Sequence, residues 1–248
     1  MKMPKMIIFD YGHTLVCEAG YDFLRGQEVL FKYIAKNKSG ATAKEVNDFA
    51  DKLFADHSAV REMGYELNER NFQHLIYEYY GIEFSVSLLE AEKIYWDNAS
   101  PGVLMPNIEK LLDYIDAKGI RSAVISNIGW SGAALTDRIN RMLPNNKFEF
   151  IIASSEYVLR KPNTLLFELA VRKADLDAGD VWYCGDKVKY DVEGSASAGI
   201  FPVWYEDLSM ENPWTEKGET RKTKTEHLHI HDWQEMIDVL DGLEKMFC

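Results

Sequence analysis

The sequence predicts an α/β fold in which a doubly wound parallel sheet is interrupted, after its first strand, by an all-helical insertion. Three observations predict this organisation. An apolar segment at residues 6–10 opens the chain. From about residue 103 onward, short apolar segments alternate with amphipathic ones, which is typical of strands and helices in a parallel sheet. The residues between these two regions have helical periodicity and almost no strand-like alternation.

The strands are predicted from short segments that are rich in β-branched or aromatic residues and are bounded by glycine or polar residues. Continuous apolar character of this kind indicates strands that are buried on both faces of a parallel sheet. In chain order they are residues 6–10, 119–127, 148–154, 180–186 and 199–205. Amphipathic helices are predicted between or beside them at residues 107–118, 131–143, 164–174 and 190–198. Right-handed crossovers would place the carboxyl ends of all strands at one edge.

The insertion is predicted to span residues 17–100, which leaves residues 1–16 and 101–248 for the sheet domain. Two helix starts within it have the capping-box pattern, Thr42-x-x-Glu45 and Ser87-x-x-Glu90. Near the end of the chain, residues 206–226 are polar and weakly patterned, so we expect a solvated loop. A last amphipathic helix is predicted from Asp232 toward Leu243.

Composition and charge narrow the class of protein. With 248 residues, of which 46% are hydrophobic, the chain can form a substantial core with an insertion. The formal net charge of −12 repels phosphate backbones and anionic lipid surfaces, so neither nucleic acid nor a membrane is an expected partner. Any anion that the protein binds must therefore meet a local cation or a metal ion. Composition and charge do not distinguish a monomer from a homodimer.

Cysteine usage and hydropathy predict a cytoplasmic protein. The three cysteines, Cys17, Cys184 and Cys248, have no C-x-x-C spacing and cannot all pair, which fits a reducing compartment. The start of the chain has no signal-peptide pattern, and no apolar run approaches the ~20 residues that a membrane-spanning helix needs.

Polar side chains stand at or just after the predicted strand ends, where a parallel sheet gathers them at one crevice. They are Asp10, Thr14, Ser126, Lys161, Asp186 and Asp191. Three crowded carboxylates repel one another unless a cation holds them, and oxygen ligands of this kind favour Mg²⁺. Lys161 and the hydroxyls would complete a cage for a phosphoryl group, which leaves Asp10 free to attack phosphorus.

Four segments in this order resemble the motifs of the haloacid dehalogenase superfamily, whose members are mostly phosphatases. They are "FDYGHTL" from Phe9, "VISN" from Val124, "RKP" from Arg160 and "GDKVKYD" from Gly185. The resemblance covers the whole chain and implies a Rossmann-like core with a helical cap inserted between the first two motifs. It also implies hydrolysis of a small phosphorylated metabolite.

By this resemblance, each motif residue has an expected role. Asp10 would be the nucleophile, and Mg²⁺ would be bound by Asp10, the backbone carbonyl of Gly12, Asp186 and, directly or through a second shell, Asp191. Ser126 would hold the phosphoryl group with help from Thr14, and Lys161 would connect this group to Asp10. Asn127, which follows Ser126, is a candidate substrate contact.

The sequence departs from the family pattern at Gly12, where the phosphatases usually carry an aspartate that acts as general acid and base. Such help contributes ~10²–10⁴ in rate. His13 could supply an imidazole instead, although adjacent residues often point apart, so it need not face the site. The missing acid at position 12 favours substrates with good leaving groups. It also leaves open the alternative of a phosphate-binding sensor with little turnover.

Two other branches of the family also lack this acid. Dehalogenases need no metal, so the presence of both Asp186 and Asp191 argues against them. Phosphonate-cleaving enzymes use a cap lysine, for which surface residues are available at Lys32, Lys36, Lys44 and Lys52. Cap residues set specificity in the family, and the candidates here are Tyr21, Arg25, His57, Arg61 and Tyr65.

Overall fold

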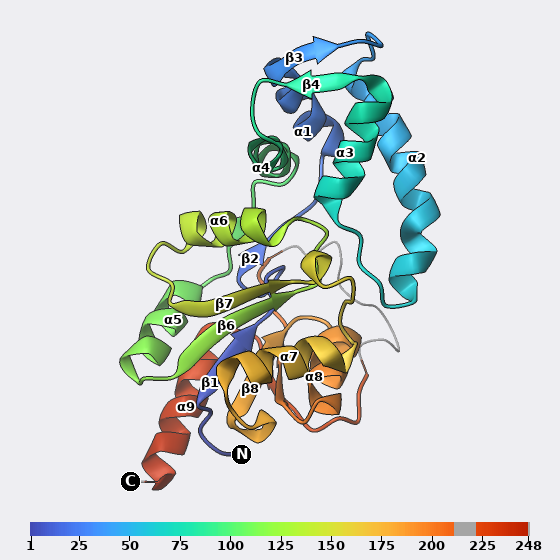
Figure 1. Cartoon of the computed structure of the whole chain (residues 1–248). Helices are drawn as coiled ribbons and strands as arrows, with labels where there is room; N and C mark the ends of the chain where they lie inside the picture. The colour runs from blue at the N-terminus through green and yellow to red at the C-terminus, as the bar shows by residue number, and fades with distance from the viewer. Residues whose placement is uncertain (211–221, 248) are drawn as a thin grey trace.

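The computed structural model describes residues 1–210 and 222–247 and contains a six-stranded parallel sheet in the order β10-β9-β8-β1-β6-β7 (Figure 1). The strands are β1 (Met6–Phe9), β6 (Arg121–Ser126), β7 (Phe148–Ala153), β8 (Val181–Gly185), β9 (Phe201–Tyr205) and β10 (Leu228–Ile230). The chain runs outward from β1 through β6 and β7, and then returns to β8 on the other side of β1. This reversal places the end of β1 at the switch point, where ligands bind in open α/β sheets.

Helices cover both faces of the sheet because successive side chains of a strand point to opposite faces. Ile7 and Phe9 of β1 face a core shared with α5, α6 and α9, whereas Met6 and Ile8 pack with α7. The helices are α5 (Ile108–Ala117), α6 (Gly132–Met142), α7 (Thr164–Ala174) and α9 (Trp233–Phe247). All four residues of β1 are fully buried, as the continuous apolar run predicts. The doubly wound fold is thereby confirmed.

Two details of the sheet domain differ from the sequence predictions. The segment predicted as a helix at residues 190–198 begins as a π-helical turn, η4 (Val188–Glu193), and continues as the short α8 (Gly194–Ser197). Strand β10 was not predicted, because three residues give too short a pattern. The predicted polar loop at residues 206–226 lies partly outside the described residues.

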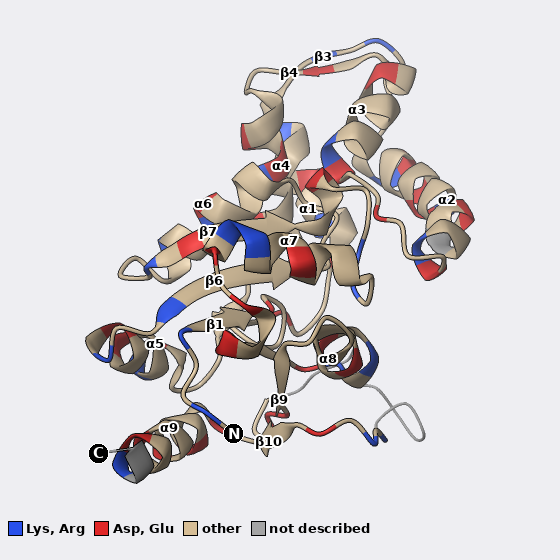
Figure 2. Ribbon diagram, turned by 60° about the horizontal axis from the view of Figure 1, so that its bottom comes forward, with Lys and Arg blue, Asp and Glu red and all other residues tan. Residues whose placement is uncertain are grey.

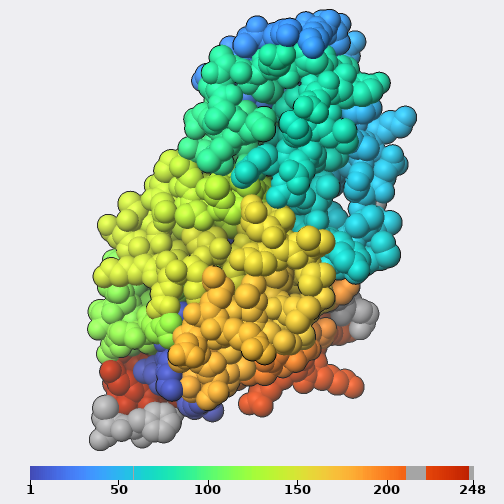
Figure 3. Space-filling view, viewed as in Figure 1, coloured from blue at the N-terminus to red at the C-terminus, as the bar shows by residue number. Residues whose placement is uncertain are grey.

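Residues between β2 (Val16–Cys17) and β5 (Val103–Leu104) form the insertion, which stands above the sheet domain in Figures 1 and 3. Its helices are α1 (Phe23–Leu30), α2 (Ala43–Glu62), α3 (Glu69–Tyr80) and α4 (Leu88–Ala99). The insertion is helical as predicted, with one addition: β3 (Ile34–Asn37) and β4 (Ile82–Phe84) form an antiparallel pair. The Thr42 capping box is present with both of its hydrogen bonds, and Ser87 caps α4 through its hydroxyl.

Acidic residues occur on both parts of the molecule, for example along α2 and α9 in Figure 2. They account for the net charge of −12. Among the described helices, none combines the length and the apolar character needed to cross a membrane.

Candidate active site

Asp10 stands where the central strand β1 ends. Phe9 pairs with Val124 of β6 on one side and with Cys184 of β8 on the other. The Asp10 amide donates to the Cys184 carbonyl at 2.8 Å, which fixes the backbone beyond the strand. The Asp10 side chain therefore projects from the middle of the sheet edge, beside the ends of both neighbouring strands.

Lys161 is buried and its ammonium contacts two of the predicted carboxylates. Nζ lies 2.8 Å from Asp10 Oδ1 and 2.6 Å from Asp191 Oδ1, and it donates to the Tyr183 hydroxyl at 2.6 Å. Burial alone would lower the pKa of Lys161, but the two carboxylates outweigh burial and raise this pKa above its ordinary value. The ammonium thus stays charged, in a position fixed by three oxygen partners.

Asp10, Asp186 and Asp191 converge so closely that one oxygen of each lies within 4.8 Å of the others. Burial, followed by the negative charges of Asp191 and Asp186, raises the pKa of Asp10 to about 7, against the opposing effect of Lys161. Lys161 contacts Asp10 and Asp191, and Lys187 Nζ lies 3.0 Å from Asp186 Oδ2, so two ammonium groups face three carboxylates. A cluster of carboxylate oxygens has the donor chemistry that a hard divalent ion such as Mg²⁺ prefers. The residues present therefore fit Mg²⁺.

Gly185 at the end of β8 permits this crowding. A Cβ atom at this position would lie 2.3 Å from the Asp191 Cγ. The Asp191 carboxylate therefore packs against backbone where any other residue would displace it. The Lys187 amide also donates to Asp191 Oδ2 at 2.9 Å.

Ser126 is the last residue of β6 and Asn127 follows it, and both residues lie at the same edge of the sheet. Ser126 is buried and lines the cavity over Asp10. The Asn127 side chain uses both amide atoms on the backbone of Lys161: Oδ1 accepts from the Lys161 amide at 2.7 Å, and Nδ2 donates to its carbonyl at 2.9 Å. Asn127, predicted as a substrate contact, is among the residues that line the cavity and also positions the lysine.

Three predicted residues lie in the turn after Asp10, and only two of them reach the cavity. Gly12 and His13 line the cavity, but Thr14 is fully buried and is not among the described lining residues. His13 has a left-handed backbone, with φ 54°, and within the described part of the chain its Nε2 has no hydrogen-bond partner. Burial and, to a smaller extent, the charge of Lys187 lower the pKa of His13 to about 4. Its ring is therefore neutral near pH 7.

A family model described as haloacid dehalogenase-like hydrolase matches residues 29–205. This chain belongs to that family. The matched range contains Ser126, Lys161, Asp186 and Asp191, whereas Asp10 precedes it. The hydrolase assignment made from the four sequence motifs is thereby confirmed.

Relatives of this hydrolase span nearly its whole length. It is 24% identical to a pyrimidine 5'-nucleotidase of Streptococcus pneumoniae, with 98% of each chain covered. It is 22% identical to a glyceraldehyde 3-phosphate phosphatase of Methanocaldococcus jannaschii, covering 98% of this chain and 100% of the relative. A solved 2-haloacid dehalogenase from Pseudomonas syringae shares the fold, with a TM-score of 0.62 and 19% identity over 97% of this chain and 99% of the other.

The hydrolase encloses a cavity of about 450 Å³ between the sheet edge and the helical insertion. The end of the cavity at Asp10 is formed by residues already described. Aromatic side chains dominate the rest of the lining, and they come from both parts of the molecule: Tyr11, Tyr21, Phe23, Phe54, Trp130 and Tyr190. A cavity of this size and apolar character suits a small organic molecule.

Of the five insertion residues expected to face substrate, two do so. Tyr21 and Arg61 line the cavity. Arg25 instead donates to the Asn98 carbonyl, and His57 contacts the Leu53 carbonyl at 2.8 Å within its own helix. Tyr65 is 46% exposed and pairs with Leu159 of the sheet domain.

Glu69 adds a polar group to the cavity that was not predicted. It begins α3, and burial raises the pKa of its carboxyl to about 7. The Gln73 side chain donates to it at 3.3 Å and partly opposes this rise. Near neutral pH the carboxyl is therefore present in both protonation states, so it can donate or accept a hydrogen bond. Glu18, Arg61, Glu66 and Arg160 are further charged residues of the lining.

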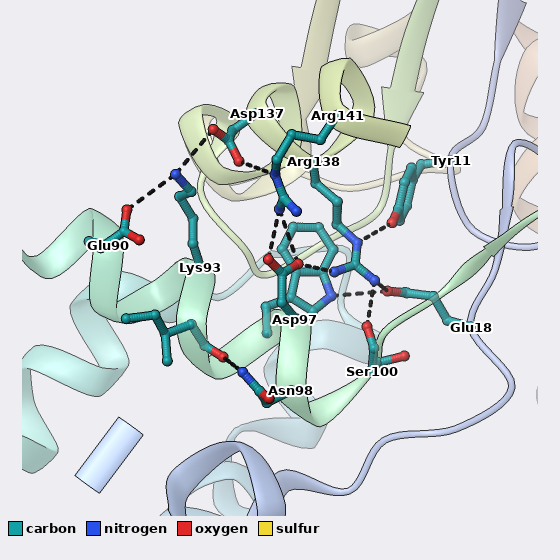
Figure 4. Close-up of polar contacts among 12 residues, drawn as sticks. Tyr11, Glu18, Glu90, Lys93, Asp97, Asn98, Ser100, Asp137, Arg138 and Arg141 are labelled. Atoms are coloured by element: carbon teal, nitrogen blue, oxygen red, sulfur yellow. Dashed lines mark hydrogen bonds and ion pairs between the residues drawn. The ribbon is translucent and has the colours of Figure 1, made fainter. Parts of the chain in front are cut away.

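Arg138 on α6 connects the sheet domain to the insertion (Figure 4). Its Nε donates to the Tyr11 hydroxyl at 2.7 Å, and its Nη2 donates to Glu18 Oε1 at 3.2 Å and to the Ser100 carbonyl. Its Nη1 donates to Asp97 of α4. Glu18 and Ser100 belong to the two chain segments that lead into and out of the insertion. One buried guanidinium thus holds both segments and the loop after Asp10.

Proposed function

We propose that this protein is a Mg²⁺-dependent phosphoric monoester hydrolase that uses Asp10 as its nucleophile. The observation that carries the proposal is the contact of Lys161 with Asp10 and Asp191 beside Asp186, at the switch point of the sheet. The phosphatase and nucleotidase named above support it as relatives. We further propose that residues 17–100 act as a cap domain over a core of residues 1–16 and 101–248, in a cytoplasmic enzyme.

The chemistry assigned to these residues has two steps. An Asp10 oxygen attacks the phosphorus atom and the bond to the ester oxygen breaks, which leaves an aspartyl-phosphate and an alkoxide or aryloxide that takes a proton from water. Water then attacks the same phosphorus atom, releases inorganic phosphate and restores the Asp10 carboxylate. Lys161 holds Asp10 in place and offsets the negative charge that gathers on the phosphoryl oxygens, while Ser126 donates to one of them.

Mg²⁺ would be held by Asp10, Asp186, Asp191 and the Gly12 carbonyl. When bound, it would supply positive charge to the phosphoryl oxygens and relieve the repulsion between the carboxylates. The convergence of the three carboxylates supports this role: burial, followed by the charges of Asp191 and Asp186, raises the pKa of Asp10, and a bound cation would offset both effects.

Position 12 is a glycine, so no carboxylic acid there can donate a proton to the leaving oxygen. His13 is the titratable side chain next to Gly12. It is among the residues that line the cavity, and its Nε2 atom is buried and has no hydrogen-bond partner among the described residues. It is neutral in the free protein, so it is suited to accept a proton from the hydrolytic water rather than to protonate the first leaving group. Substrates with good leaving groups would therefore react fastest.

The aromatic lining supports a substrate whose alcohol part carries a flat, partly apolar group. Tyr21 and Phe23 stack with their ring centroids 5.0 Å apart at one side of the cavity, and Trp130 lies on the sheet domain. Aromatic walls bind planar rings by stacking, and Glu69 can pair with a ring donor or acceptor. Nucleoside 5'-monophosphates have these features, whereas a triose phosphate would leave most of the cavity unfilled.

A phosphatase screen with and without Mg²⁺ tests the proposal. The panel should contain nucleoside monophosphates, triose phosphates and an aryl phosphate, with Asp10→Asn as the inactive control. We expect Mg²⁺-dependent release of phosphate, highest for the aryl phosphate and then for nucleotides.

The second candidate function is a phosphate-ligand sensor, which the glycine at position 12 favours. Tight nucleotide binding without phosphate release from any substrate would support the sensor and contradict the hydrolase.

A further inference from the structure

Two histidines and a glutamate meet at the edge of the sheet, outside the catalytic cavity. Glu206 follows β9, His229 lies in β10, and His231 follows β10. His229 Nε2 lies 2.9 Å from Glu206 Oε2, and His231 Nε2 lies 3.8 Å from the same oxygen. One donor atom from each residue lies within 4.8 Å of the others. None of the three is among the described residues that line the cavity over Asp10.

Strand pairing brings these side chains together. Trp204 of β9 pairs with His229, and the Glu206 amide donates to the Ile230 carbonyl at 2.9 Å, which places Glu206 beside His231. Because alternate residues of a strand share a face, the two histidines and Glu206 project from the same side of the β9–β10 pair. The arrangement therefore depends on the backbone of the sheet rather than on a flexible loop.

The ring of His229 is held in place by stacking. It lies against the Trp204 indole with ring centroids 4.0 Å apart and an interplanar angle of 8°. Trp204 is in turn packed against Val188 and Val192 of η4. The His229 and His231 side chains remain 33% and 43% exposed, so an ion has access from solvent.

The spacing of the donor atoms suits a tetrahedral ion. Zn²⁺ lies ~2.0–2.2 Å from imidazole nitrogen and carboxylate oxygen, which places adjacent ligand atoms about 3.3 Å apart. The two measured separations, 2.9 and 3.8 Å, lie on both sides of this value. Glu235 Oε2 accepts a hydrogen bond from the His231 backbone amide at 3.1 Å, which helps to hold His231 beside Glu206.

We propose that Glu206, His229 and His231 form a binding site for a divalent transition-metal ion, with Zn²⁺ as the preferred ion and water as the fourth ligand. The site differs in chemistry from the three aspartates around Lys161, which offer only oxygen. Imidazole nitrogen selects Zn²⁺, Ni²⁺ or Co²⁺ over Mg²⁺. A bound ion would connect the edge strand β10 to the end of β9.

Titration of the whole protein with Co²⁺ and Zn²⁺ in excess Mg²⁺ tests the proposal. The experiment is best done on the Asp186→Asn variant, which weakens metal binding at the aspartate cluster. We expect one Co²⁺ per chain, with the visible absorption bands of a tetrahedral ion, and displacement of Co²⁺ by one equivalent of Zn²⁺. His229→Ala or His231→Ala should abolish the bands.

His74→Ala is a matched control, because His74 forms an exposed pair with Glu78 at 3.4 Å but has no second histidine near it among the described residues. It should bind Co²⁺ like the parent. Circular dichroism verifies that each variant is folded, and His229→Gln replaces His229→Ala if the latter is not. Absence of binding by the parent, or unchanged binding by folded His229 and His231 variants, would overturn the proposal. Co²⁺ binding is measured independently of phosphatase activity. The proposed metal site can therefore be confirmed or rejected separately from the proposed function.

Discussion

Lys161 Nζ lies 2.8 Å from Asp10 Oδ1, and both groups are buried at the centre of the sheet edge. Removing the ammonium leaves Asp10 and Asp191 without their shared cation. We expect Lys161→Met to lose turnover and to reduce the free energy of unfolding by about 3–5 kcal/mol, because breaking a buried ion pair leaves unpaired charge. Urea unfolding measures this change.

Lys173→Met on α7 is the control for Lys161→Met, because Lys173 is exposed and its ammonium lies over the Phe150 ring, 5.5 Å from the centroid. It should change the free energy of unfolding by less than about 1 kcal/mol. A Lys161→Met protein as stable and as active as the parent would show that the ammonium is not essential to the site.

Mg²⁺ should stabilise the protein more at pH 8 than at pH 5. The folded Asp10 carboxyl has a pKa of about 7, above its ordinary value of 3.8. The metal-free fold therefore loses stability from this group as pH rises from about 4 to about 7, and metal binding offsets that loss once the proton has left. Thermal unfolding with and without Mg²⁺ measures the shift in Tm. Asp186→Asn should reduce it, and a shift that is equal at both pH values would contradict the assigned site.

Gly12→Asp should restore general acid catalysis. A Cβ atom at this position meets nothing within 4 Å, and the backbone of Gly12 does not have a positive φ, so a side chain fits. We expect turnover of alkyl phosphates to rise by ~10²-fold or more, with little change for aryl phosphates, since these need no protonation. Gly12→Asn has the same shape without the acid and should give no gain. Equal rates for the two variants would locate the limiting step elsewhere.

Arg138 should be more important for stability than its neighbour Arg141, although both bond to Asp97. Arg138 is 1% exposed and contacts Tyr11 and Glu18, whereas Arg141 is 48% exposed. We expect Arg138→Met to cost about 3–5 kcal/mol of unfolding free energy and Arg141→Met less than about 1 kcal/mol, measured by urea unfolding. Equal costs would contradict the connecting role assigned to Arg138.

The parts of the fold that were predictable are those encoded in local patterns. The apolar run of β1 and the polar residues at strand ends require only short segments, and parallel topology brings those ends together. Contacts between distant residues could not be predicted in this way. Tyr183 has the pattern of a core aromatic residue, yet it accepts a hydrogen bond from Lys161. Arg138 appears as one charge on an amphipathic helix, and its partners lie 127, 120 and 41 positions away.

The cavity lining was predictable only in part for a similar reason. Helical periodicity does not tell which side of α2 faces the sheet domain, so Arg61 and His57 were equal candidates before the orientation of the helix was known. Asn127 was expected at the substrate because it follows Ser126, but its amide is engaged by the Lys161 backbone. The sequence indicated which residues lie near the site, but only the packing of side chains showed which groups each of them contacts.

Trapping the covalent intermediate tests the central claim most directly. Borohydride reduces an aspartyl-phosphate to homoserine, which mass spectrometry of the digested protein can locate. During turnover with Mg²⁺ and an aryl phosphate, we expect homoserine at position 10, at a level that depends on substrate. Rapid phosphate release without modification of Asp10, or with modification at another carboxylate, would contradict the assignment of Asp10 as the nucleophile.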